Sequence, residues 1–346
     1  MEQWNIIKAY DYCYNVTDGT HDSPKQTEFG KYLITSKHIK DNRIDFESAY
    51  KISEDDYNKI ITRSKVDQWD IIISMIGAYC GFCCIESSKQ TDYAIKNVGL
   101  LKVGNELKCK WLYYYLTSPH GKQQLSKLRS GSSQPYISLG ALRNLDIPVP
   151  NENTMSDIVS VLSSLDSKIE LNRRINDNLE QQAQALFKSW FVNNPNPNWR
   201  EATLSEVAHF IGGYSYNGEE LTDSSNVAMA TIKNFGRNGG FKVDGFKDIT
   251  PLGKLKECHY ANMFDILVAH TDLTQNADVI GNAELLLTKG NYESIIFSMD
   301  LVKVLPNNSF PYKFLLAAML KSKVFKGHCL GYVNGTTVLH LSKKAL

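Results

Sequence analysis

The feature of this sequence that most constrains its fold is a long stretch without glycine or proline, from Thr154 to Phe191. Within it, apolar residues recur at alternating spacings of three and four, the heptad pattern of a helix that pairs with another helix. The pattern predicts one continuous helix, roughly 55 Å long at 1.5 Å per residue. The seam positions are Met155, Ile158, Leu162, Leu165, Ile169, Asn172, Asn176, Leu179, Ala183, Leu186 and Trp190.

Two interpretations of this helix remain open at the level of sequence. It forms a coiled coil, or it is a long amphipathic helix that packs on a globular body. Asn172 and Asn176 lie near the middle of the seam, where asparagine weakens pairing but fixes its register. Thr154 and Asp157 resemble a capping box at the start of the helix. All seam residues except Met155 and Ala183 are candidate subunit-interface residues.

The segments on either side of this helix are diverged copies of each other. The matches keep the same order in both copies, which chance would not produce. They pair Lys37 with Lys233, Trp69-Asp70-Ile71 with Phe264-Asp265-Ile266, and Gly131-Ser132-Ser133 with Gly335-Thr336-Thr337, at offsets of 196, 195 and 204.

Each copy mixes strand and helix signals. In the first, Ile71 to Ile76 is a predicted buried strand, and Trp111 to Leu128 predicts one or two helices interrupted by Pro119. Ile147-Pro148-Val149-Pro150 then ends the copy, because proline neither continues a helix nor donates to a central strand ladder. We therefore predict an α/β (α+β) fold with two repeated domains, 1–150 and 199–346, joined by a coiled-coil helix within 151–198.

Composition gives few pointers to function. The formal net charge is only +1, so a claim of nucleic-acid binding must rest on local patches rather than on overall charge. No apolar run reaches membrane-spanning length and the N-terminus lacks the order of a secretory signal, so a cytoplasmic protein is expected. Seven cysteines favour free thiols. For Cys80, Cys83 and Cys84, buried thiols are a better interpretation than a redox or zinc site, although the sequence leaves both open.

Motifs for catalysis are missing from the sequence. A DNA amino-methyltransferase carries Pro-Pro-aromatic after Asp or Asn, and the nearest string, Asn194-Pro195-Asn196-Pro197, lacks it. No Gly-rich phosphate loop ending in Gly-Lys is present. His270 and Asp272 form a tempting pair, but the first copy has no counterpart, so we interpret them as local polarity. We expect no enzyme activity, no cofactor and no metal.

The order of copy, long helix and copy resembles a type I restriction-modification specificity subunit. The strings that carry the resemblance are Asp18-Gly19-Thr20-His21, Trp69-Asp70-Ile71-Ile72, Ser130-Gly131-Ser132-Ser133-Gln134 ahead of Ile147-Pro148-Val149-Pro150, Leu165 to Asn172, and Gln181 to Phe191.

The resemblance implies two target-recognition domains, each gripping one half of a bipartite site on double-stranded DNA. It implies two antiparallel helices that hold these domains apart, methyltransferase subunits that dock on the helices, and a restriction (translocase) subunit that joins for cleavage. The second copy stops at Leu346, where the first continues into its exit strand and long helix. We therefore expect a C-terminally truncated subunit, incomplete in its second domain, whose uncovered helix pairs with a second copy or with partner helices.

Base contacts are expected in polar loops, because Arg suits guanine, Gln suits adenine, and hydroxyl or amide groups hold phosphate. A solvated turn is the competing interpretation for each loop, a turn cap for His21, and a solvated side chain for the two lysines. The candidates are Thr20, His21, Lys25, Lys37, Arg129, Ser130, Ser132, Ser133, Gln134 and Tyr136 in the first copy, and Lys233, Asn334, Thr336 and Thr337 in the second.

Two other functions stay open. The chain is a decoy or half-subunit that dimerises and binds methyltransferase subunits without reading DNA well, or it is an unrelated coiled-coil scaffold with duplicated ligand-binding domains. Salt-dependent duplex binding separates DNA recognition from a scaffold.

Overall fold

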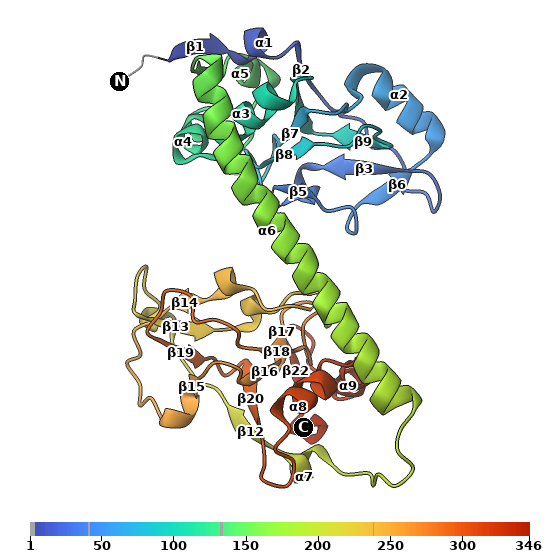
Figure 1. The fold of residues 1–346 in the computed structure, drawn as a ribbon, viewed down its shortest axis with the longest axis vertical. Coiled ribbons are helices and arrows are strands. Elements are labelled where there is room, and N and C mark those ends of the chain that lie inside the picture. The colour runs from blue at the N-terminus through green and yellow to red at the C-terminus, as the bar shows by residue number, and fades with distance from the viewer. Residues whose placement is uncertain (1–3, 41, 132–133, 238) are drawn as a thin grey trace. The chain divides into compact units, whose positions relative to one another are not determined.

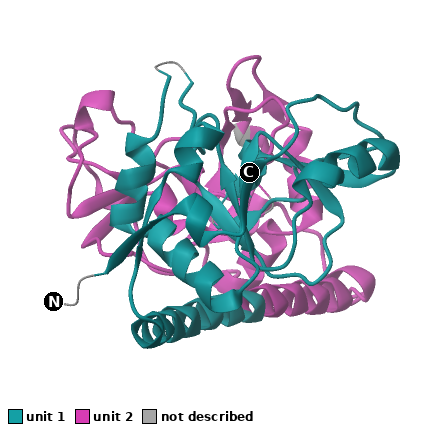
Figure 2. Cartoon of the chain, turned by 90° about the horizontal axis from the view of Figure 1, so that it is seen from above, with its two compact units in different colours: residues 1–175 teal, residues 176–346 magenta. Residues whose placement is uncertain are grey.

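The computed structural model describes residues 4–40, 42–131, 134–237 and 239–346. The chain forms two compact units, residues 1–175 (unit 1) and 176–346 (unit 2), and the division falls inside one long helix (Figures 1 and 2). Each unit combines helices with antiparallel and parallel strand pairs. The predicted fold class, two α/β copies joined by a long helix, is confirmed.

Unit 1 is built on a four-stranded antiparallel sheet in the order β2-β10-β7-β8. A smaller sheet, β6-β3-β9, contains a parallel pair, β3 and β9. The elements are β1 (Asn5–Lys8), α1 (Ala9–Tyr12), β2 (Asn15–Asp18), β3 (Lys31–Thr35), β4 (Ile39–Lys40), β5 (Arg43–Ile44), β6 (Tyr50–Ile52), α2 (Glu54–Ser64), β7 (Asp70–Ser74), β8 (Cys83–Glu86), β9 (Tyr93–Lys96), β10 (Val98–Lys102), α3 (Glu106–Thr117), α4 (Pro119–Lys127), α5 (Leu139–Arg143) and β11 (Asp146–Val149).

The core of unit 1 lies on both faces of this sheet, because strand side chains alternate between faces. Ile71 and Ile73 of β7 pack with helix residues such as Leu112 of α3. Ile72 packs on the other face with residues of the smaller sheet, including Ile95. All five residues of β7 are buried, which confirms the predicted buried strand, although it spans Asp70–Ser74 and does not reach Ile76.

Unit 2 repeats this topology with the sheet order β12-β20-β16-β18 and a smaller sheet, β14-β13-β19-β15, in which β13 and β19 are parallel. Its elements are α7 (Leu204–Val207), β12 (Ala208–Gly212), β13 (Val227–Ala230), β14 (Lys247–Asp248), β15 (Tyr260–Ala261), β16 (Ile266–Ala269), β17 (Thr271–Asp272), β18 (Ala283–Leu285), β19 (Ser294–Phe297), β20 (Leu301–Pro306), α8 (Lys313–Leu320), α9 (Lys323–Leu330), β21 (Val333–Asn334) and β22 (Leu339–Leu341).

The repeat extends to unusual backbone positions. Trp69 and Phe264, paired by the sequence match, both have positive φ, 64° and 67°, a conformation that L-residues rarely adopt. The N–H of Trp69 donates to Glu86 O, and the N–H of Phe264 donates to Leu286 O, each at 2.7 Å. The two copies therefore share a fold down to single hydrogen bonds, and not only a sequence pattern.

The helices after the central sheet begin at identifiable caps. Asn105 accepts from the N–H of Lys108 at the start of α3, and Ser118 accepts from the N–H of Gly121 at the start of α4. Pro119 occupies the first turn of α4, where its missing N–H costs nothing, so Trp111 to Leu128 forms two helices rather than one. The exit strand β11, which contains Pro148, pairs with β1 in a two-stranded sheet.

The long helix α6 spans Glu152–Phe187 and continues as a short π-helical segment, Lys188–Asn193. The prediction of a continuous helix is therefore confirmed, but the capping box predicted at Thr154 is wrong. The side chain of Asn151 accepts from the N–H of Thr154 at 2.8 Å, so the helix begins two residues earlier. Among the described residues, no helix combines the length and the apolar character that crossing a membrane would need.

Each unit holds its own part of α6. In unit 1, Met155 and Val159 are buried against Trp111, and the hydroxyl of Tyr114 donates to Asp166 at 2.8 Å. In unit 2, Lys321 forms an ion pair with Glu180 at 2.8 Å. The remaining predicted seam residues are half-buried (Ile158 and Leu162) or exposed (Leu165, Ile169, Asn172, Asn176, Leu179, Ala183, Leu186 and Trp190).

Candidate nucleic-acid interface

The loops that carry most predicted contact residues of unit 1 meet at one edge of its central sheet. β2 ends at Asp18 opposite Gly99, and β10 begins at Val98 opposite Ser74, the last residue of β7. The loop after β2, the turn before β10 and the loop after β7 therefore share this edge, which we call the loop edge. Loops positioned by a rigid scaffold in this way commonly carry the binding residues of a protein.

The loop after β2 is fastened at its start. Gly19 passes so close to Ile95 that a Cβ at this position would overlap the carbonyl oxygen of Ile95. The ring nitrogens of His21 lie 3.1 Å from Asp18 Oδ2 and 3.0 Å from Asn97 Oδ1. His21 is thus tied to its own turn, as the capping interpretation expected, although its side chain remains 66% exposed.

Cationic side chains surround this loop. Arg63 forms an ion pair with Asp18, and Lys96 donates to the hydroxyl of Ser23 at 2.5 Å. Lys25 is exposed, while Thr20, another predicted contact, is half-buried. No sequence pattern singled out Arg63 or Lys96, because each lies far along the chain from the loop it touches.

Lys37 is placed beside the same edge by the smaller sheet. β3 runs parallel to β9 with Thr35 opposite Lys96, and Lys37 follows in a 3-10 turn. The hydroxyl of Ser36 donates to Asn97 O at 2.9 Å, which holds this turn against the start of β10. Lys37 is exposed and no ion pair involves it among the described residues.

Lys233 occupies the equivalent position of unit 2, in the turn Ile232–Asn234 after β13. In unit 1 the N–H of Thr35 donates to the ring of His38 at 3.0 Å, and in unit 2 the N–H of Thr231 donates to Asn234 at 2.8 Å. Burial is the main cause that lowers the pKa of His38, with the charge of Lys37 adding to it, so this histidine accepts as a neutral ring. Two different residues thus build the same turn.

The predicted hairpin of unit 1 lies against the loop after β7. Ser130 and Tyr136 exchange backbone hydrogen bonds of 2.8 Å, and the N–H of Gly77 donates to Pro135 O at 2.9 Å. Gly131 has a φ of 85°, which favours glycine at the start of the hairpin loop. Ser130, Gln134 and Tyr136 are exposed, and Ser132 and Ser133 lie outside the described residues.

Arg129 has a structural contact that the sequence pattern did not predict. Its Nη2 donates to Cys80 O at 2.6 Å and so ties the hairpin to the loop after β7. The side chain is exposed, and a guanidinium has five N–H donors, so this bond leaves donors for a ligand.

Unit 2 presents the same pair of loops at its own edge. β16 ends at Ala269 opposite Leu301, and the hairpin pairs Asn334 with His340. Gly335 has a φ of 117°. Asn334, Thr336 and Thr337 are exposed at the hairpin.

The cysteines and the His270/Asp272 pair take structural positions. All seven cysteines are free, and all except Cys258 are buried, with burial raising the pKa of Cys83 to about 12. The carboxylate of Asp272 accepts backbone N–H groups of its own loop rather than facing a ligand. In the described parts of the chain, no three His, Cys, Asp or Glu side chains gather as a metal site requires.

Comparison with known proteins places the chain in a family. Residues 2–181, more than half of the chain, match the type I restriction modification DNA specificity domain. The chain is 44% identical over 136 residues to the type I restriction enzyme HindI specificity subunit of Haemophilus influenzae, which is 39% of this chain and 28% of that protein. It is 25% identical over 194 residues to the MjaVIII specificity subunit of Methanocaldococcus jannaschii, 54% of this chain and 45% of that protein.

These matches span less than half the length of either relative. A solved structure, the type I restriction-modification S subunit from M. genitalium, aligns with 95% of this chain and 80% of its own at 18% identity and a TM-score of 0.47. The sequence match over residues 2–181 reaches from the first unit into the long helix. The chain belongs to the type I restriction-modification specificity family.

Proposed function

We propose that this chain is the non-catalytic, sequence-reading subunit of a type I restriction-modification complex, and that each unit takes one half of a bipartite site on double-stranded DNA. The observation that carries the proposal is the loop edge. Each unit builds it from corresponding strands of its own central sheet, but with different loops. A shared frame with different loops is what two readers of different sequences need, because the frame sets position and the loops set base contacts.

Phosphate contacts fall to the lysines of the two matching turns. Lys37 and Lys233 stand at equivalent, exposed positions, although the residues around them differ. A contact to a DNA phosphate carries no sequence information, so it suits a position that both copies keep. Lys25, Thr20 and His21 belong to the neighbouring loop and support the same surface.

Base contacts in unit 1 fall to the hairpin from Arg129 to Tyr136. We predict that Arg129→Ala or Gln134→Ala relaxes sequence preference in one half-site only, at about 1–3 kcal/mol for each lost bidentate contact. Methylation mapping of the variant measures this. An unchanged preference would remove this hairpin from the reading surface, and a collapse of both half-sites would mean that the variant had lost its fold.

The complex also needs a docking surface, and α6 supplies the candidate. Leu165, Ile169, Leu179 and Leu186 of α6, and Trp190 of the π-helical segment that follows, are each about half exposed or more, which is unusual for so many large apolar side chains. The proposed partners are methyltransferase subunits, with a restriction subunit that joins for cleavage. The proposed location of the complex is the cytoplasm. No cofactor is required of this chain.

The experiment that tests the proposal is genome-wide methylome mapping with and without the chain. We expect a two-part motif that is methylated only when the chain is present. Methylation that does not depend on the chain would overturn the proposal.

A second candidate function is a decoy or half-subunit that associates through its helix without reading DNA well. The exposed apolar residues of α6 favour it, since burial of each contributes roughly 1–3 kcal/mol to association with a second copy. Duplex binding separates the two functions, because a sequence reader binds DNA with steep salt dependence and a helix-only module does not.

A further inference from the structure

The loop after β16 in unit 2 is a longer version of the loop after β7 in unit 1. Both are closed by the same pair of backbone bonds. Ser74 donates to Phe82 O and accepts from Gly81, while Ala269 donates to Asn282 O and accepts from Gly281. Between these anchors unit 1 has residues 75–80 and unit 2 has residues 270–280, so the loop of unit 2 has five extra residues.

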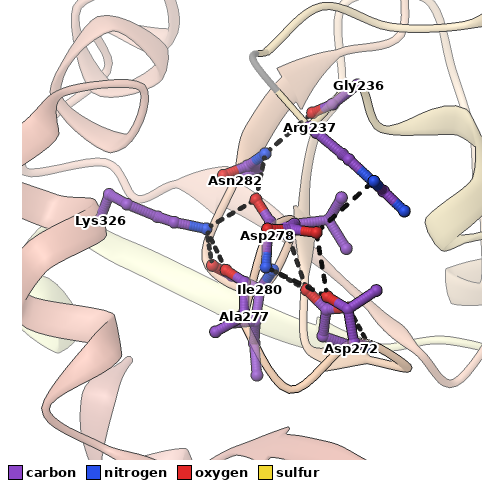
Figure 3. A network of polar contacts seen from close by, with 10 residues as sticks. Gly236, Arg237, Asp272, Ala277, Asp278, Ile280, Asn282 and Lys326 are labelled. Carbon is purple, nitrogen blue, oxygen red and sulfur yellow. Dashed lines mark hydrogen bonds and ion pairs between the residues drawn. The ribbon is translucent and has the colours of Figure 1, made fainter. Parts of the chain in front are cut away.

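A buried carboxylate organises the inside of this longer loop (Figure 3). Asp272, 2% exposed, accepts the N–H of Val279 at 2.6 Å and both the N–H and the hydroxyl of Thr274 at 2.8 Å. Burial alone would raise the pKa of Asp272, but these hydrogen bonds outweigh it and lower the pKa, so the carboxylate stays charged. The start and the end of the loop are thereby fixed to one side chain.

Cations hold the loop from outside. Lys326 of α9 donates to the carbonyl oxygens of Ala277, Asp278 and Ile280 at 3.1, 3.2 and 2.5 Å, and Arg237 forms an ion pair with Asp278 at 3.5 Å (Figure 3). Ala277 has a φ of 52°, a left-handed conformation that is unfavourable for a non-glycine residue. A backbone strained in this way persists where its surroundings determine it, and such positions cluster at binding sites.

What this framework presents to solvent is the tip of the loop. Leu273, Gln275 and Asn276 are exposed, whereas Thr271, Asp272, Ala277, Val279 and Ile280 are buried. Gln275 is the member whose side chain is already oriented, because its Nε2 donates to Thr336 O of the hairpin at 2.6 Å. Nε2 also lies 3.5 Å from Thr337 O, so the second N–H makes at most this long bond, and the carbonyl oxygen of the amide is left for a ligand.

Gln275 therefore offers a base its carbonyl oxygen as acceptor and, beside it, an N–H whose only other contact is the long one to Thr337 O. Adenine presents the complementary pair in the major groove, with N7 as acceptor and the N6 amino group as donor, and Gln binds it with two hydrogen bonds. Because the amide is oriented before binding, less side-chain entropy is lost when the base is bound.

We propose that Gln275 is a specificity-determining residue that reads an adenine in the half-site of unit 2, and that Asp272 and Lys326 are positioning residues for it. This inference rests on the proposed function. It assigns to the loop after β16 a base-reading role that the sequence pattern of unit 2 indicated only for the hairpin.

The experiment selects bound duplexes from a pool with a randomised central segment, using the full chain and its variants. We expect the wild-type chain to enrich a two-part motif, and Gln275→Ala to lower discrimination at one adenine of one part by roughly tenfold. Gln90→Ala is the matched control, since Gln90 is exposed in the loop between β8 and β9, away from the loop edge.

A base analogue tests the contact itself. Replacing the adenine by 7-deazaadenine removes N7, so it should weaken binding by the wild-type chain but not by Gln275→Ala. Asp272→Asn and Lys326→Met should reduce preference at the same base, whereas a purely structural role would weaken all positions together. Thermal unfolding of each variant shows that it is folded.

The outcomes separate the two proposals. A wild-type motif that Gln275→Ala leaves unchanged would overturn this inference and leave the proposed function standing. A wild-type chain that enriches no motif would overturn the proposed function, and this inference with it.

Discussion

In each unit, one glycine lies where the backbone passes too close to a neighbouring strand for any side chain. Gly19 in unit 1 and Gly213 in unit 2 both follow the first strand of the central sheet. A Cβ on either would overlap a carbonyl oxygen, that of Ile95 for Gly19 and that of Ser298 for Gly213. These glycines let the loop cross the neighbouring strand closely enough to join the loop edge.

We therefore predict that Gly213→Ala destabilises unit 2 by about 1–3 kcal/mol, because the backbone must shift to make room for the methyl group. The adjacent Gly212 is the matched control, since a Cβ there meets nothing within 4 Å. Urea unfolding measures both variants. Equal stability of the two would show that the loop adjusts freely and that the close approach of the backbone does not fix the loop edge.

The sequence predicts the turns and hairpins of the loop edge only where a single residue type can build them. The positive φ of Trp69 and Phe264 and the glycines of the hairpins fall on positions that the sequence match had paired. His38 and Asn234 make the same turn with unlike side chains. Arg129 fastens the loop after β7 in unit 1, and Lys326 fastens the loop after β16 in unit 2, but the two residues do not occupy equivalent positions. Such substitutes leave no sequence signal, so these clamps could not have been predicted.

At the scale of elements, the long helix was the most predictable feature, because few structures besides a helix produce a period of 3.5 residues over many turns. Its start was mispredicted because Asn151, rather than Thr154, provides the side-chain acceptor. The loop after β16 was missed for another reason. The offset between copies rises from 195 at Trp69 to 204 at Gly131. That increase signals inserted residues, but only the structure assigns five of them to this loop.

The exposed apolar residues of α6 lead to a prediction about association. We expect Leu165→Gln with Ile169→Gln to leave unfolding within about 0.5 kcal/mol of wild type, since both sites are exposed and Gln suits a helix. The same variant should lose self-association in sedimentation at micromolar concentration.

Met155→Ala provides the contrast on the same helix. It removes a side chain buried against Trp111, so it should destabilise unit 1 by about 2–5 kcal/mol. A wild-type chain that sediments as a clean monomer would count against α6 as a self-association surface.

At the scale of the whole molecule, a formal net charge of +1 leaves no general attraction to DNA. Under the proposed function, binding comes from cations placed along the loop edge, and the slope of binding against salt counts them, at about 0.9 for each phosphate contact. Lys37→Ala and Lys233→Ala should each reduce this slope by about one and weaken all sequences alike. Lys89→Ala is the control, because Lys89 is exposed between β8 and β9, at the other end of the strands. If Lys89→Ala lowered the slope and Lys37→Ala did not, DNA would lie along the opposite edge, and the loops assigned to base reading would face away from it.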